Sequence, residues 1–143
     1  TTALDVTIQA QVLKMMKNLQ KELGSSVLLI THDLGVVVSF CDAVSIMYAG
    51  EIVESGALED VFDRKRKHHP YTEGLFASIP DIHSQAPRLK PIPGLMPDPV
   101  NLPEGCKFNP RCPYCTDICR EQSVELKDYD GLKVRCHRYE EVR

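Results

Sequence analysis

The feature that most constrains this chain is its cysteine distribution, because five of its six cysteines fall between Gly105 and His137. So short a segment buries little apolar surface, and it therefore needs cross-links or a bound metal to hold one structure. Thiols gathered at short spacing form disulfides, a zinc site or an iron–sulfur cluster. Disulfides and metal sites predict different compartments, so the rest of the chain bears on the choice.

The spacing of the cysteines narrows the metal options without deciding between them. Structural zinc usually takes two close pairs of thiolates, and here Cys112 and Cys115 form one such pair while Cys136 is isolated unless His137 serves beside it. An iron–sulfur cluster needs four thiolates and accepts looser spacing. The chain offers C-x5-C-x6-C-x16-C in Cys106, Cys112, Cys119 and Cys136. Spacing alone leaves zinc and a cluster open.

Composition divides the 143 residues into three segments. Residues 1–67 alternate helical and strand patterns, residues 68–103 predict a short helix and a proline-rich linker, and residues 104–143 are rich in cysteine. A hydrophobic fraction of 43% predicts a globular protein, and a net charge of −3 gives no support for nucleic-acid binding. The basic run at 63–69 is interpreted as a solvated linker.

The first segment predicts an α/β order. Asp5 is a good N-cap for a helix over residues 6–23, and Gly24 is placed to end it. "SVLLI" predicts a buried parallel strand, which "THD" follows directly. A second short helix around "LGVVVSFC" leads to a hairpin, with "AVSIMY" and "EIVE" as strands and a turn at Ala49 and Gly50. His32 lies one residue beyond the predicted parallel strand, where ligands of open α/β sheets collect.

Five motifs, in order, resemble a known family. "TALD" resembles the D-loop, "ITHD" the switch strand with the H-loop histidine, and "DAVSIMYAGEIVESG" the following strand pair of ABC transporter nucleotide-binding domains. "HHPYTEGLFASIP" and "GCKFNPRC" resemble the C-terminal extension of the ATP-binding subunits of oligopeptide and dipeptide permeases. The resemblance implies an α/β fold: the C-terminal part of a P-loop (RecA-like) ABC nucleotide-binding domain, followed by a small irregular cysteine-rich extension stapled by metal.

The resemblance also implies roles for two residues. His32 would contact the γ-phosphate of ATP and stabilise the charge that builds during phosphoryl transfer, a reaction governed by positioning and electrostatics. Asp5, at the end of the D-loop, would couple the site to a second ATP-binding subunit across a dimer. As a simpler alternative, Asp5 acts only as a helix cap, and the two roles are compatible.

The family's other nucleotide motifs are missing from these residues. The chain contains no G-x-x-x-x-G-K-[ST] phosphate loop, and it lacks the signature and Walker B motifs. We expect a missing N-terminal portion, and we expect the chain alone to be inactive while the complete subunit is an ATPase that uses ATP with Mg²⁺.

The resemblance places the complete subunit on the cytoplasmic face of the membrane, where it would energise peptide import. The implied partners are a second ATP-binding subunit, the transmembrane permease subunits and, indirectly, a peptide-binding protein. The alternative function, from another class, is a stand-alone metal-binding regulatory or interaction module without ATPase activity.

The implied compartment and family together favour a metal over disulfides. Thiols stay reduced in the cytosol, and the family extension carries four cysteines that look like ligands of a [4Fe–4S] cluster, matching Cys106, Cys112, Cys119 and Cys136. Zn²⁺ is the alternative metal. Cys115 would be a bystander thiol or, as the alternative, a substitute ligand, and Cys41 would be a core residue. We expect a structural role for the cluster, with redox or iron sensing as the alternative.

Overall fold

The computed structural model describes residues 5–79 and 91–139, and it forms two compact units, residues 1–42 and 43–143. Two predicted features fall partly outside the described residues: the first three residues of the D-loop motif "TALD" and positions 80–90 of the proline-rich linker. No helix in the described ranges is long and apolar enough to cross a membrane.

The first unit contains two helices, both capped as the sequence predicts. Helix α1 (Val6–Leu23) begins at Asp5, whose side chain accepts a hydrogen bond from the backbone N–H of Thr7 at 2.7 Å, and it ends at Gly24 in the left-handed region. Helix α2 (Leu34–Phe40) begins at Asp33, which accepts from two backbone N–H groups. These caps satisfy donors that the first turn of a helix leaves free.

The predicted parallel strand over residues 26–30 is wrong. The segment has no strand geometry, and Leu28 and Ile30 are 89% and 90% exposed. A strand exists through hydrogen bonds to a neighbouring strand, and within the described part of the first unit this segment has none. The apolar pattern is real, but its partner strands are missing from these residues.

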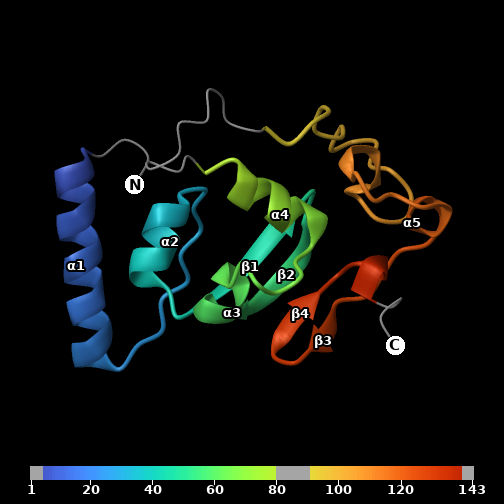
Figure 1. The fold of residues 1–143 in the computed structure, drawn as a ribbon. Coiled ribbons are helices and arrows are strands. Elements are labelled where there is room, and N and C mark those ends of the chain that lie inside the picture. The colour runs from blue at the N-terminus through green and yellow to red at the C-terminus, as the bar shows by residue number, and fades with distance from the viewer. Residues whose placement is uncertain (1–4, 80–90, 140–143) are drawn as a thin grey trace. The chain divides into compact units, whose positions relative to one another are not determined.

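The second unit is built on an antiparallel sheet (Figure 1). Strands β1 (Ala43–Tyr48) and β2 (Glu51–Ala57) form the predicted hairpin, and Ala49 and Gly50 form its two-residue turn with φ of 47° and 82°. Strands β3 (Lys127–Tyr129) and β4 (Leu132–Val134) form a second hairpin. Since β4 pairs with β2, the sheet order is β1-β2-β4-β3. The sheet therefore joins the first and last predicted segments of the sequence.

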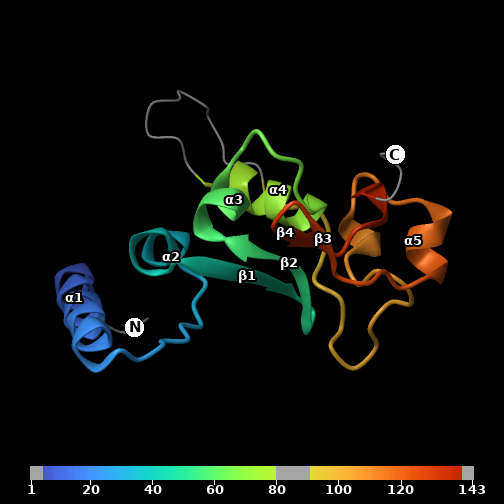
Figure 2. The same ribbon diagram turned by 90° about the horizontal axis from the view of Figure 1, so that it is seen from below.

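Three further helices and two 3₁₀ turns complete the described part of the second unit. Helices α3 (Leu58–Phe62) and α4 (Pro70–Ala77) lie on one face of the β1–β2 pair (Figures 1 and 2). Pro70 occupies the first turn of α4, as predicted. The cysteine-rich segment contributes the turn η1 (Asn109–Arg111), helix α5 (Asp117–Glu121) and the turn η2 (His137–Tyr139). The mixed helix-and-sheet class is thus confirmed.

The core of the second unit unites the sheet with the cysteine-rich segment. Tyr48 on β1 packs edge-on against Phe108, with ring centroids 5.1 Å apart, and Tyr71 on α4 contacts both rings. The buried apolar residues of this core are Ile46, Tyr48, Val53, Val61, Phe108, Leu132, Val134 and Cys136. Apolar burial is the main stabilising contribution to such a fold, so the segment that carries the cysteines is part of the hydrophobic core.

Candidate functional site

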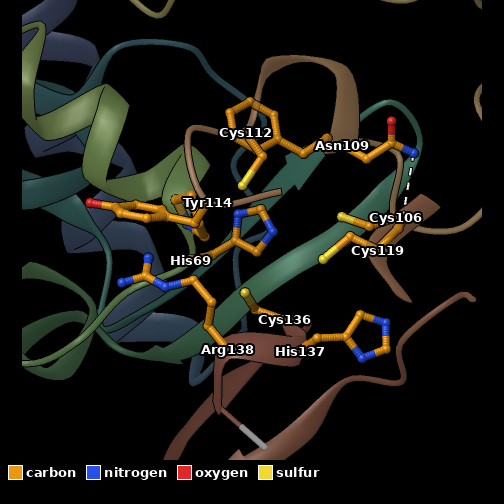
Figure 3. Close-up of a pocket in the computed structure, with 11 residues that line it drawn as sticks. His69, Cys106, Asn109, Cys112, Tyr114, Cys119, Cys136, His137 and Arg138 are labelled. Atoms are coloured by element: carbon orange, nitrogen blue, oxygen red, sulfur yellow. Dashed lines mark hydrogen bonds between the residues drawn. The ribbon is translucent and has the colours of Figure 1, made fainter. Parts of the chain in front are cut away.

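The four cysteines of the predicted ligand set line one cavity in the second unit. Cys106, Cys112 and Cys119 come from the loops around η1 and α5, and Cys136 follows β4. Figure 3 shows their sulfur atoms facing a common space, with His69 and Arg138 at its edge. All six cysteines of the chain are free thiols. The fold thus gathers thiols that lie up to thirty positions apart in the sequence.

Backbone hydrogen bonds hold the loops that carry these thiols. The N–H of Cys106 donates to the carbonyl of Cys119 at 2.9 Å, which ties the first ligand position to the third. Gly105 makes this approach possible, because it has φ of +64° and a Cβ there would lie 2.5 Å from the same carbonyl oxygen. Asn109 donates its side-chain amide to the Glu104 and Cys119 carbonyls.

The cavity resists ionisation of its thiols while nothing is bound. Burial raises the pKa of Cys112 and of Cys136 to about 11 and also raises the pKa of Cys106. Repulsion from neighbouring cysteines adds to each pKa shift. A hydrogen bond from a backbone N–H two residues later in the chain opposes it; the donors to Cys106, Cys112 and Cys136 are Phe108, Tyr114 and Arg138, respectively. Three thiols thus share one local arrangement, in which a backbone amide favours the thiolate.

As the side chains stand, no group of three or more metal-ligating residues in the described ranges could hold a metal ion. The predicted [4Fe–4S] cluster and its zinc alternative are therefore not supported by the structure, and neither is the metal-stapled extension. A tetrahedral zinc ion needs its thiolate ligands about 2.3 Å from a common centre. That the four thiols share a cavity is a finding, and that they bind metal stays a prediction.

His69 forms one wall of the cavity. It is 1% exposed, it caps α4 by accepting the N–H of Tyr71 on Nδ1 at 3.1 Å, and its ring contacts Phe108. Burial, with Arg138 nearby, lowers the pKa of His69 to about 3, so the imidazole is neutral near pH 7. The sequence analysis placed His69 in the basic run at 63–69, interpreted as a solvated linker, and missed this position.

Arg138 forms the cationic edge of the cavity. Its guanidinium stacks on Tyr114, 3.6 Å from the ring centroid, and its Nη1 lies 3.5 Å from a carboxylate oxygen of Glu73. This Nη1 is buried and has no hydrogen-bond partner among the described residues. A buried donor without a partner is costly, so it is a place where a bound group would be stabilised.

A buried ion pair connects the sheet to the start of α4. Glu54 on β2 is fully buried, and its two carboxylate oxygens accept from His68 Nδ1 at 2.6 Å and from the N–H of His69 at 2.8 Å. His68 Nε2 donates to the carbonyl of Asp63 at 2.8 Å, so both ring nitrogens donate and the ring is an imidazolium. Burial alone would lower the pKa of His68, but the hydrogen bond to Glu54 and the contacts that reinforce it raise it overall.

The basic run at 63–69 is therefore not the solvated linker predicted. Arg66 binds Asp60 and donates to the carbonyls of Tyr129 and Asp130 at 3.0 and 2.9 Å, and Lys67 donates to the carbonyl of Arg138. These bonds attach the run to the β3–β4 turn and to the residue at the cavity edge. Apart from Asp60, their partners lie more than sixty positions away in the sequence, which is why a local charge pattern could not reveal them.

The remaining predicted residues are not among those that line the cavity. In the first unit His32 is exposed in a bend, directly before the Asp33 cap of α2, and Asp5 caps α1. Cys41 is partly buried, and burial followed by repulsion from Asp42 raises its pKa. In the second unit Cys115 lines a neighbouring hollow with Thr116, whose carbonyl lies 3.6 Å from its sulfur. The nucleotide roles of His32 and Asp5 stay predictions.

Comparison with known proteins finds relatives along almost the whole chain. Residues 53–119 match the family described as oligopeptide/dipeptide transporter, C-terminal region. The oligopeptide transport ATP-binding protein AppD of Bacillus subtilis is 51% identical over 142 residues, which cover 99% of this chain and 43% of the relative. The dipeptide transport ATP-binding proteins DppD of Haemophilus influenzae and Escherichia coli are 44% and 42% identical over 96% of the chain.

Almost the whole chain is thus similar to ATP-binding proteins of oligopeptide and dipeptide transport, and residues 53–119 match the C-terminal region of that transporter family. The chain spans about two fifths of the length of these relatives. The predicted resemblance to an ABC transporter ATP-binding subunit is thus confirmed, and the alternative of a stand-alone metal-binding module is not favoured. The family match includes three of the four predicted ligands, Cys106, Cys112 and Cys119, together with His69.

Proposed function

We propose that this chain is part of an ATP-binding subunit that hydrolyses ATP to energise import of oligopeptides or dipeptides across the cytoplasmic membrane. The observation that carries the proposal is the 42–51% identity, over almost the whole chain, to proteins named as oligopeptide or dipeptide transport ATP-binding proteins. The subunit would lie peripherally on the cytoplasmic face, bind the permease subunits, and pair with a second ATP-binding subunit. A peptide-binding protein would deliver the cargo.

His32 is the proposed catalytic residue, acting on ATP with Mg²⁺ in the complete subunit. Its imidazole is exposed, and the chain on either side is held by the Thr31 hydroxyl, which accepts the N–H of Asp33 at 3.1 Å, and by the Asp33 cap on α2. A hydrogen-bond donor fixed in this way is suited to stabilise charge on a terminal phosphate. Asp5 would transmit nucleotide binding to the partner subunit while it caps α1.

The test is ATP turnover of the complete subunit that contains these residues. We expect His32→Ala to lower turnover by about tenfold or more, because electrostatic stabilisation of the transition state is lost. Lys14→Ala, a change at an exposed position of α1, is the matched control and should leave turnover unchanged. Wild-type turnover in His32→Ala would refute the assigned role of His32.

We further propose that Cys106, Cys112, Cys119 and Cys136 hold a [4Fe–4S] cluster. Two properties of this cavity support the proposal: four thiols face one space, and backbone amides favour the thiolate at three of them. Four thiolates are the usual ligand set of such a cluster. When bound, it supplies thiolate bonds that cross-link the loops.

Metal content of anaerobically purified protein tests the cluster. We expect iron and sulfide in the wild type, and loss of both when Cys106, Cys112, Cys119 or Cys136 is changed to Ser. Cys41→Ser and Cys115→Ser are the matched controls and should keep the wild-type iron content. Stoichiometric zinc without iron, or iron that depends equally on Cys115, would overturn the assigned cluster or its ligand set.

A further inference from the structure

The hydrogen bonding of His69 fixes where its proton lies. Its Nδ1 accepts the backbone N–H of Tyr71 at 3.1 Å, so that nitrogen carries no proton. A neutral imidazole has one acceptor nitrogen and one N–H. The proton must therefore be on Nε2, so His69 presents a single hydrogen-bond donor at the far end of its ring.

That donor is directed into the cysteine-lined cavity. His69 lines the cavity together with the four cysteines, and Figure 3 shows its outer ring nitrogen pointing into the space between their sulfur atoms. The ring has little freedom to turn away, because the cap on Tyr71 fixes one edge and Phe108 packs at 5.7 Å between centroids. The backbone of His69 is held separately by Glu54.

The same cavity wall carries a positive charge. Arg138 lines the cavity, its guanidinium is fixed over Tyr114, and its buried Nη1 has no hydrogen-bond partner in the described ranges. The guanidinium also lies 3.5 Å from a carboxylate oxygen of Glu73 and points away from the sulfur atoms in Figure 3, so the hydrogen-bond donor that faces the thiols is His69. Groups of this kind stabilise negative sulfur, and in iron–sulfur proteins they raise the reduction potential.

We propose that His69 is a positioning residue of the metallocentre: its Nε2–H donates a hydrogen bond to a sulfur of the bound cluster while its Nδ1 caps α4. This inference rests on the proposed cluster. It gives the His-Pro-Tyr-Thr stretch a structural role, because the His69 side chain would contact both the bound cluster and the first turn of α4. Occupancy of the cavity and order at the N-terminus of α4 are then coupled through a single ring.

Two substitutions separate the two halves of this role. His69→Asn keeps a short side chain that caps helices well but cannot reach the cavity. His69→Gln can carry an N–H to the place of Nε2 but caps poorly. We expect the cluster of His69→Asn to have a lower reduction potential than the wild type, and we expect His69→Gln to restore most of the difference. Thermal unfolding of the metal-free chain should show the opposite order, with His69→Gln the less stable.

The experiment is a potentiometric titration of the reconstituted 143-residue chain with dithionite, followed by the electron paramagnetic resonance signal of the reduced cluster. A potential lowered in His69→Asn and recovered in His69→Gln supports the inference. Equal potentials in all three proteins that carry a cluster overturn it and leave the metallocentre intact. A wild type that takes up no iron overturns the metallocentre, and the inference fails with it.

Discussion

The two units of this chain differ in what stabilises them. In residues 5–42 the buried apolar side chains are Val36 and Phe40, whereas Leu28 and Ile30 are almost fully exposed. In residues 43–139 an eight-residue buried core joins the sheet, α3 and the cysteine-rich segment. The hydrophobic patterns of the two sequences do not explain this contrast, since both units have well-formed ones. It shows that the second unit contains the partners of its own apolar side chains and the first does not.

The largest predicted effect on stability comes from truncating one apolar side chain in each unit. Phe108→Ala removes a 1%-exposed ring that contacts Tyr48 and Tyr71, so we expect the free energy of unfolding to fall by about 3–5 kcal/mol. Leu28→Ala, at an 89%-exposed position, should change it by less than about 0.5 kcal/mol. Urea unfolding of the metal-free chain, followed by circular dichroism, measures both.

The same pair of variants sharpens the comparison in the complete subunit. If residues 26–30 pair with strands supplied by the rest of the protein, Leu28→Ala should become destabilising there, by about 2–5 kcal/mol. A Leu28→Ala effect that stays negligible in the complete subunit would show that this apolar pattern is not completed by a sheet.

A smaller effect comes from the two buried histidines of the second unit. His69 has a pKa of about 3, below the unfolded value of about 6.5, so the unfolded chain binds more protons and stability falls on acidification, by about 2 kcal/mol between pH 7 and 5. His68 has a raised pKa through Glu54 and Glu73, so its contribution is complete below about pH 6.5 and is lost as pH rises through the folded value.

These opposite signs predict a stability maximum near the ordinary histidine pKa. Between pH 5 and 8, His69→Asn should flatten the acid side of the profile, and His68→Gln should flatten the alkaline side. Chemical unfolding at half-unit pH steps measures each slope. An acid slope that is unchanged in His69→Asn would contradict the assignment of a buried neutral ring beside Arg138.

The smallest predicted effect concerns the helix caps of the first unit. Asp33 accepts from the N–H groups of Gly35 and Val36 at 2.9 and 3.2 Å, so Asp33→Ala should cost about 1 kcal/mol, and Asp33→Asn should retain most of that contribution. Helical content from circular dichroism checks this. Equal loss in both variants would show that the carboxylate charge, not the cap geometry, holds α2.

Features that depend on neighbouring residues could be predicted from the sequence. The helix over 6–23 needs only its apolar period, the Asp5 cap and Gly24, and the hairpin turn needs only residues that accept positive φ at Ala49 and Gly50. The four cysteines that line one cavity could be selected from the five clustered ones because the family resemblance implied them.

Features that depend on distant partners could not be predicted. The strand at 26–30 failed because a strand requires neighbours that these residues lack. His68 and His69 were predicted to lie in an exposed linker. Their partner is Glu54, on β2, and no local pattern reveals that its buried carboxylate bonds both residues. The same holds for Arg138, whose place at the cavity follows from the pairing of β4 with β2.

The pairing of β2 with β4 also has a consequence for biosynthesis. Glu54 and Val134 are register partners about eighty positions apart, and Cys136 follows two residues later. While the polypeptide is still growing, β2 has an unpaired edge, and the last thiol of the cavity has not emerged. Insertion of the proposed cluster must then wait until translation of this region is finished, and a transcript cut short near residue 130 should give an aggregation-prone product.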